Sequence, residues 1–154
     1  MAKAHVLDGD DPRKLNVREK PYLLFPVGKW ADDPAKFLAF LGISPHAVAK
    51  SGFDRLRALA TIEFFALDDI AARKNLFRER ATILVSMYPQ LEVLATSASS
   101  AARKKRAEKV VDAATSFKAP HANCARSFKR LFERAPGQAL EMFDAAAEYV
   151  QSIS

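Results

Sequence analysis

Three arginines spaced four residues apart form the most distinctive surface pattern in this 154-residue sequence. Because an α-helix turns once in about 3.6 residues, Arg126, Arg130 and Arg134 share one side of the helix predicted over 121–134. A guanidinium group presents planar N–H donors that match phosphate oxygens. Like charges at this spacing weaken a helix by roughly a few tenths of a kcal/mol per pair. The stripe, with Lys129 beside it, therefore predicts a negatively charged partner.

An acidic stripe on the last predicted helix offers a different partner for these arginines. Glu141, Asp144 and Glu148 follow one hairpin turn later in the chain, on the side opposite the apolar residues of that helix. They could neutralise the arginines within one chain or across a dimer. The sequence leaves both partners, an external polyanion and the acidic helix, open.

A second basic cluster stands at the start of the preceding helix, directly after Ser99 and Ser100. Its five members are Arg103, Lys104, Lys105, Arg106 and Lys109. Consecutive bases can bind phosphates without sequence preference. Lys104 lies four residues before Glu108, a spacing that allows an ion pair within the helix. The cluster is interpreted either as a phosphate-binding surface or as an ordinary solvated helix face.

The net charge of +6 is unevenly distributed along the chain. Residues 71–134 carry a net +9, residues 1–70 are neutral, and residues 135–154 carry −3. Clustered Lys and Arg supply the sequence-independent part of nucleic-acid affinity. The charge pattern thus favours a nucleic acid as the partner, although it also fits a soluble basic protein.

Three further charged residues are predicted inside the bundle. Arg73 and Arg80 lie seven residues apart within the apolar side of their helix, and Glu63 lies between Leu59 and Leu67 on the helix before it. A charge in an apolar setting requires a partner. We expect Glu63 to form a buried ion pair with one of the two arginines, in a structural role. An enzyme site built from these three groups is a weaker alternative.

Signals of catalysis, cofactor binding and metal binding are poor. Cys124 is the only cysteine, so neither an intrachain disulfide nor a cysteine-rich zinc site can form. His121 and Cys124 are one helical turn apart, which supplies two metal ligands where three or four are usual. The five glycines are isolated, so a glycine-rich phosphate loop is lacking. We expect a protein that is not an enzyme and that holds neither a metal nor a cofactor.

A turn near the beginning of the helical region is similar to the centre of the helix-turn-helix family of DNA-binding motifs. The residues that carry the resemblance are Leu41 to Val48, with Gly42 in the turn and Ser44-Pro45 opening the next helix. The resemblance spans about residues 36–55 and implies two short helices that cross at the turn. Leu38 at a position usually given to a small residue and the early stop at Ser51-Gly52 depart from it. A plain connector between two core helices is the alternative.

The fold class predicted from these patterns is all-α, a single-domain bundle of about six to seven helices. Residues 1–30, with prolines around Tyr22 to Phe25, are expected to form an extended arm on the bundle, and residues 31–154 the bundle itself. No strand pair is predicted, and the third helix is interpreted as central and buried because its apolar residues surround it. The predicted helices cover about 32–42, 45–51, 53–67, 68–88, 101–118, 121–134 and 138–153.

The sequence therefore predicts a non-enzymatic helical protein that binds DNA or RNA through backbone phosphates, with a subunit of a nucleoprotein assembly as one setting. A protein-interaction module or homo-oligomeric adaptor, such as a homodimer, is the alternative. Apolar runs are far shorter than the roughly 20 residues of a membrane span, and no secretory signal is recognised. We expect a soluble, cytoplasmic protein without a membrane partner.

Overall fold

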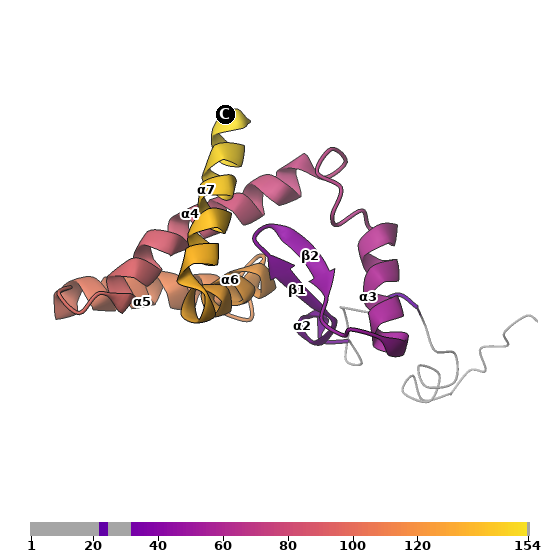
Figure 1. The fold of residues 1–154 in the computed structure, drawn as a ribbon, viewed down its shortest axis with the longest axis horizontal. Helices are drawn as coiled ribbons and strands as arrows, with labels where there is room; N and C mark the ends of the chain where they lie inside the picture. Colours follow the sequence, from indigo (N-terminus) through magenta and orange to yellow (C-terminus); the bar gives the residue numbers. More distant parts are fainter. Residues whose placement is uncertain (1–21, 25–31, 154) are drawn as a thin grey trace, which may run out of the picture.

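Helices make up most of the chain that the structure describes. The computed structural model describes residues 22–24 and 32–153. The elements in these ranges are α2 (Pro34–Phe37), β1 (Leu38–Leu41), β2 (Ser44–Ala47), α3 (Gly52–Phe64), α4 (Lys74–Ala95), α5 (Ala101–Thr115), α6 (Ala122–Arg134) and α7 (Pro136–Ser152). Helices α4 to α7 gather on one side of the molecule and α3 stands on the other, with the two strands between them (Figure 1). The predicted all-α fold class is confirmed.

The main core surrounds α4, the longest helix. The α4 side chains of Phe77, Leu84 and Met87 are fully buried. Helices α5, α6 and α7 pack against α4, and the Tyr88 ring stacks on Phe143 of α7 with 4.5 Å between ring centroids. Burial of this apolar surface is the main source of stability. The core residues contributed by the other three helices are Val111, Cys124, Ala125, Phe128, Ala139 and Ala146.

Residues 38–47 form a β-hairpin where two short helices were predicted. Strands β1 and β2 are antiparallel, with Leu41 opposite Ser44 and Phe40 opposite Pro45. The two-residue turn begins with Gly42 at a φ of +59°, which a glycine adopts without strain. Pro45 is tolerated because its position does not require a donated ladder hydrogen bond. The helix predicted over 32–42 forms only as the single turn of α2, capped by Asp33, and its continuation past Phe37 was wrong. The helix predicted over 45–51, the absence of strands and the helix-turn-helix resemblance were also wrong.

Helix α3 exists as predicted, but it is peripheral and not central. Its inner side packs Ala58 and Ile62 against Leu24 and Leu38, in a small second core. The helix ends in a Schellman motif, in which Ala66 has a left-handed φ of 49° and the Leu67 N–H donates to the oxygen of Ile62 at 2.9 Å. Because the left-handed position is occupied by alanine and not by glycine, the end of α3 could not be recognised from the sequence. The opposite side of α3 remains exposed.

Helix α4 begins later and ends later than predicted. Residues 65–73 form turns, so Asp68 and Asp69 do not start the helix. Pro89 lies inside α4, which continues to Ala95. Proline costs a helix one hydrogen bond, but the neighbouring Tyr88 and Leu91 are buried on the core side and hold the next turn in place. Tertiary packing here outweighs the local signal.

The predicted extended arm over residues 1–30 lies outside the described residues except at positions 22–24. Within that short piece, the Leu24 N–H donates to Thr61 Oγ1 at 3.0 Å, and the Tyr22 ring meets the edge of Phe53 with 5.5 Å between centroids. This piece of chain therefore packs on α3.

Candidate nucleic-acid interface

Side chains of α6 fasten the helix to the open edge of β1. The Phe40 N–H donates to Ser127 Oγ at 3.2 Å, and Asn123 Nδ2 donates to the Leu38 oxygen at 2.7 Å. These two backbone groups point away from β2, because Leu38 and Phe40 occupy positions that do not bond across the hairpin. An exposed strand edge is otherwise a site of unwanted pairing. The hairpin and α6 are thus held in a fixed relationship.

A pocket of about 310 Å³ opens at this junction. Arg130 and Arg134 of α6 line one wall, and His46 of β2 lines the other. Ser127 of α6 also lines the pocket, and Arg130 Nη2 donates to its Oγ at 3.5 Å. None of the described residues lining the pocket is acidic. The pocket therefore combines two guanidinium groups, a hydroxyl and an imidazole, which are donors suited to a phosphate group.

A second depression, of about 300 Å³, lies on the other side of the arginine stripe. Its lining includes Arg126, Lys129, Arg130 and Glu133. Arg126 Nη1 also donates a hydrogen bond to the backbone oxygen of Thr115, in the last turn of α5, at 3.4 Å. A cation at that end of a helix interacts favourably with the helix dipole. Arg126 therefore has a structural contact, whereas the guanidinium groups of Arg130 and Arg134 are exposed at the pocket.

The acidic stripe of α7 does not neutralise these arginines within the chain. No ion pair joins Glu141, Asp144 or Glu148 to the α6 arginines; the ion pairs shown among residues 22–24 and 32–153 are Arg57–Asp32 and His121–Glu79. The reason is packing: α7 turns Ala139, Ala146 and Phe143 to the core around α4, which leaves its acids exposed on the other side. The intrachain interpretation of the stripe was wrong.

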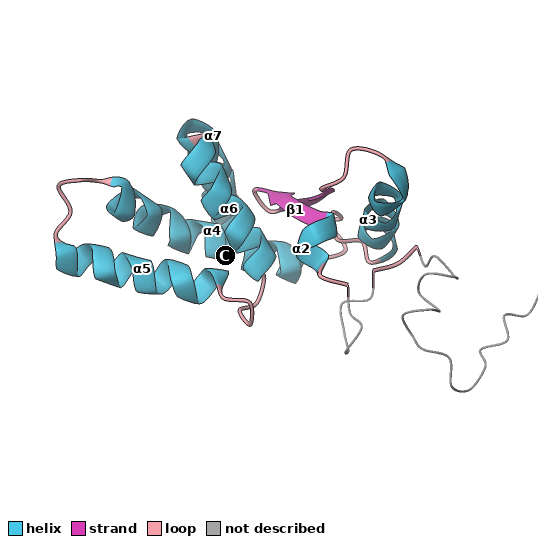
Figure 2. Ribbon diagram, turned by 90° about the horizontal axis from the view of Figure 1, so that it is seen from below, coloured by secondary structure: helices cyan, strands magenta, loops and turns pink. Residues whose placement is uncertain are grey.

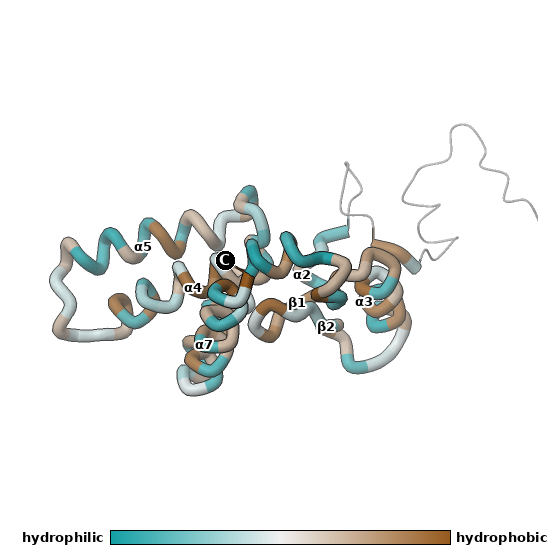
Figure 3. Tube along the Cα trace, turned by 90° about the horizontal axis from the view of Figure 1, so that it is seen from above, coloured by the Kyte–Doolittle hydropathy of each residue, from teal (hydrophilic) through white to brown (hydrophobic). Residues whose placement is uncertain are grey.

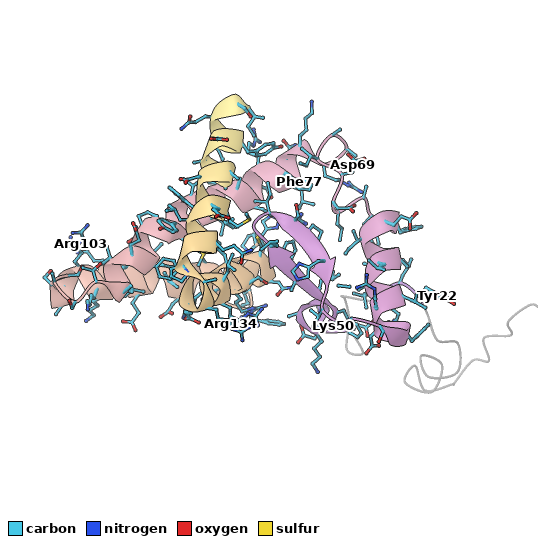
Figure 4. The ribbon with its side chains drawn as sticks, in the orientation of Figure 1. Tyr22, Lys50, Asp69, Phe77, Arg103 and Arg134 are labelled. Atoms are coloured by element: carbon cyan, nitrogen blue, oxygen red, sulfur yellow. The ribbon has the colours of Figure 1, made fainter. Side chains whose placement is uncertain are left out.

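The basic cluster of α5 is a separate surface. Arg103 lies at the far end of α5, well away from Arg134 (Figure 4). Ser100 caps the helix by accepting the Arg103 N–H at 3.3 Å. Arg103, Lys105, Arg106 and Lys109 are exposed and Lys104 is half-buried, and the expected pairing of Lys104 with Glu108 is not formed. The α5 cluster around Arg103 and the α6 stripe that ends at Arg134 therefore form separate surfaces.

The predicted buried ion pair is absent, because Glu63 and Arg73 are both exposed. Arg73 Nε donates to the Phe65 oxygen at 3.0 Å. Arg80 is buried, as predicted, but its partners are backbone oxygens: Nη1 donates to Ile43 at 3.1 Å and to Leu67 at 3.0 Å. Its guanidinium carbon also lies over the Phe40 ring, 4.8 Å from the centroid. Carbonyl oxygens and an aromatic face thus replace the expected carboxylate.

Cys124 belongs to the core beside Arg80. Its Sγ donates to the Gly42 oxygen at 3.4 Å, so it also contacts the hairpin turn. Burial raises the pKa of the Cys124 thiol to about 12, against a smaller opposing effect of Arg80, and burial lowers the pKa of Arg80. The thiol is therefore protonated at neutral pH and unreactive as a nucleophile.

An ion pair that the sequence did not predict borders a further depression between α4 and α5. His121 Nε2 lies 2.8 Å from Glu79 Oε2, and His121 has a left-handed φ of 55° at the start of α6. The depression, about 600 Å³, has an apolar lining that includes Ile83, Ala114 and Pro120. The two paired residues are 42 positions apart in the chain, so no local spacing could have revealed them.

Comparison with known proteins gives no match: no family model matches the chain, and no curated protein or solved structure matches it significantly. Within residues 22–24 and 32–153, no group of three or more His, Cys, Asp or Glu side chains could hold a metal ion. None of the described helices is both long enough and apolar enough to cross a bilayer.

Proposed function

We propose that this protein binds nucleic acid through backbone phosphates, with Arg130 and Arg134 as the principal contacts. The observation that carries the proposal is the pocket at the junction of α6 and the hairpin, where both guanidinium groups and His46 meet with no acidic side chain in the lining. Phosphate groups are bound by clustered donors of this kind, and arginine is favoured because it can donate two parallel hydrogen bonds.

The rest of the basic surface has a supporting role. Lys129 extends the stripe along α6, and Arg126 contributes charge while it contacts the end of α5. The α5 cluster around Arg103 lies apart, so it would engage a more distant stretch of the same polymer. Contacts of this kind read the backbone and not the bases, so DNA and RNA are both candidate ligands. A nucleoprotein assembly is the corresponding setting.

Charge reversal at the pocket tests this proposal. We expect Arg130→Glu/Arg134→Glu to abolish binding to a labelled DNA duplex or RNA strand, measured by fluorescence anisotropy at low salt. Lys74→Glu/Arg78→Glu is the matched control, because these two cations are also exposed and four residues apart, on α4. The control should keep most of the binding. Equal losses in both variants would mean that net charge alone, and not the pocket, drives the binding, and unchanged binding in the first would refute the proposal.

A further inference from the structure

Helix α3 carries an apolar surface that nothing in the described chain covers. We define its outer face as Phe53, Leu56, Leu59, Ala60 and Phe64, which share one side of the helix at 3.6 residues per turn. Figure 2 shows α3 apart from α4 to α7, with the hairpin and α2 in between. Along the tube of α3, brown hydrophobic segments alternate with teal hydrophilic ones (Figure 3). A helix with apolar residues on opposite sides is normally buried on both sides.

The exposed area is of the size that a specific interface requires. On the outer face Phe64 is 69% exposed, Leu56 52%, Leu59 40% and Phe53 37%, and Tyr22, whose ring packs on Phe53 beside this face, is 60% exposed. With about 200 Å² for each aromatic side chain, these residues present about 500 Å² of apolar surface. An interface of average composition built around this apolar patch would bury about 900 Å² on each partner, since somewhat over half of an interface is apolar. Stable interfaces bury about 800 Å² per partner.

The charges on α3 indicate which partner fits. Glu63 is the one acidic residue within the outer face, near the C-terminal end, and Arg55 borders the face near the N-terminal end. If a second copy of α3 packs antiparallel and centred on Leu56 and Ala60, each Glu63 meets the first turn of the opposite helix. There it is close to Arg55 and to the positive end of the helix dipole, whereas Asp54 of the same turn lies on the opposite side of that helix. A parallel pair would instead place the two glutamates side by side.

We therefore propose that the outer face of α3 is a two-fold dimer interface, in which two copies of the helix pack antiparallel. The outer face then becomes buried in the dimer, as its composition requires. In a two-fold interface both subunits contribute the same patch, so its charges must complement each other. Glu63 and Arg55 meet this condition, because each Glu63 lies near the Arg55 of the other copy. The proposal is independent of the nucleic-acid function, because the outer face includes none of the arginines of α6.

Measurement of molar mass by light scattering over a concentration series tests the dimer. We expect the wild-type protein to approach twice the 17.0 kDa of one chain. Leu56→Glu should raise the dimer dissociation constant by about a hundredfold, because a charge at the centre of the interface is buried twice. Leu140→Glu is the matched control, since Leu140 on α7 is 43% exposed but lies outside the face. It should dimerise like the wild type.

The charge pattern gives a second test that does not depend on an apolar substitution. Glu63→Arg and Arg55→Glu should each weaken the dimer, and the double variant Glu63→Arg/Arg55→Glu should restore it. Circular dichroism verifies that each variant is folded. A wild-type protein that stays monomeric at all concentrations would overturn the proposal, even if it bound a vesicle or another protein through α3. If the double variant dimerises no more tightly than the single variants, the antiparallel arrangement is overturned.

Discussion

Arg80 Nη1 donates a hydrogen bond to the backbone oxygen of Ile43 at 3.1 Å, which joins the buried part of α4 to the turn of the hairpin. The same nitrogen donates to Leu67 in the segment between α3 and α4. One guanidinium group therefore holds three separate parts of the chain together. Since the hairpin carries His46 toward α6, Arg80 also positions one wall of the candidate phosphate pocket without lining it.

Replacement of Arg80 by methionine should lower the free energy of unfolding by about 2–4 kcal/mol. The substitution retains apolar volume but removes the donor from two carbonyl oxygens, one of which is in the hairpin turn. Urea unfolding followed by circular dichroism measures the change. Arg78→Met, at an exposed position on α4, should change stability by less than about 0.5 kcal/mol. Similar small effects for both variants would contradict a structural role for Arg80.

Replacement of Ala66 by glycine should stabilise the protein by about 0.5–1 kcal/mol. Ala66 adopts a left-handed φ of 49° in the Schellman motif that ends α3, and only glycine adopts this conformation without strain. Thermal unfolding should show a higher midpoint. Gly42→Ala should have the opposite effect, because its φ is +59° and a Cβ there would lie 3.0 Å from Met142 Sδ. A destabilised Ala66→Gly protein would refute this description of the α3 end.

The Cys124 thiol should make the protein less stable as the pH rises above about 9. The folded pKa of about 12 exceeds the ordinary value of 9.0, so the unfolded chain loses this proton first and unfolding becomes easier, by up to about 1.4 kcal/mol per pH unit. Cys124→Ala removes this contribution. The stability gap between wild type and variant, measured in urea at about pH 8 and pH 10.5, should therefore narrow at high pH. A gap that stays constant would show that the thiol ionises equally in both states.

The helices that the sequence revealed most clearly are those whose signals are local. For α5, α6 and α7 the apolar spacing is local, with Ser100 capping α5 and Pro136-Gly137 separating α6 from the rest of α7's sequence pattern. The hairpin was missed because Leu41-Gly42 followed by Ser44-Pro45 fits both a helix connector and a two-residue β-turn. The contacts made by the hairpin are distant in the sequence: Gly42 lies close against Met142, one hundred positions away, and the Phe40 N–H donates to Ser127.

The candidate site was predictable only in part, for the same reason. The spacing of Arg130 and Arg134 identified one wall of the pocket, because residues four apart share a helix side. Ser127 joins the site through Phe40, 87 positions distant, and no local pattern encodes that contact. The apolar circumference of α3 was interpreted as burial inside the bundle, although the fold buries only one side of the helix. Sequence patterns indicate that a surface is buried, but not what buries it.

The salt dependence of nucleic-acid affinity tests the central claim most directly. Removal of one cation that binds a phosphate should reduce the slope of log K against log salt by about 0.9 for duplex DNA. Arg130→Gln/Arg134→Gln should therefore lower the slope by about 1.8 relative to the wild type, while Lys74→Gln/Arg78→Gln leaves it nearly unchanged. A wild-type protein without salt-dependent affinity, or an identical slope in both double variants, would contradict a phosphate site at Arg130 and Arg134.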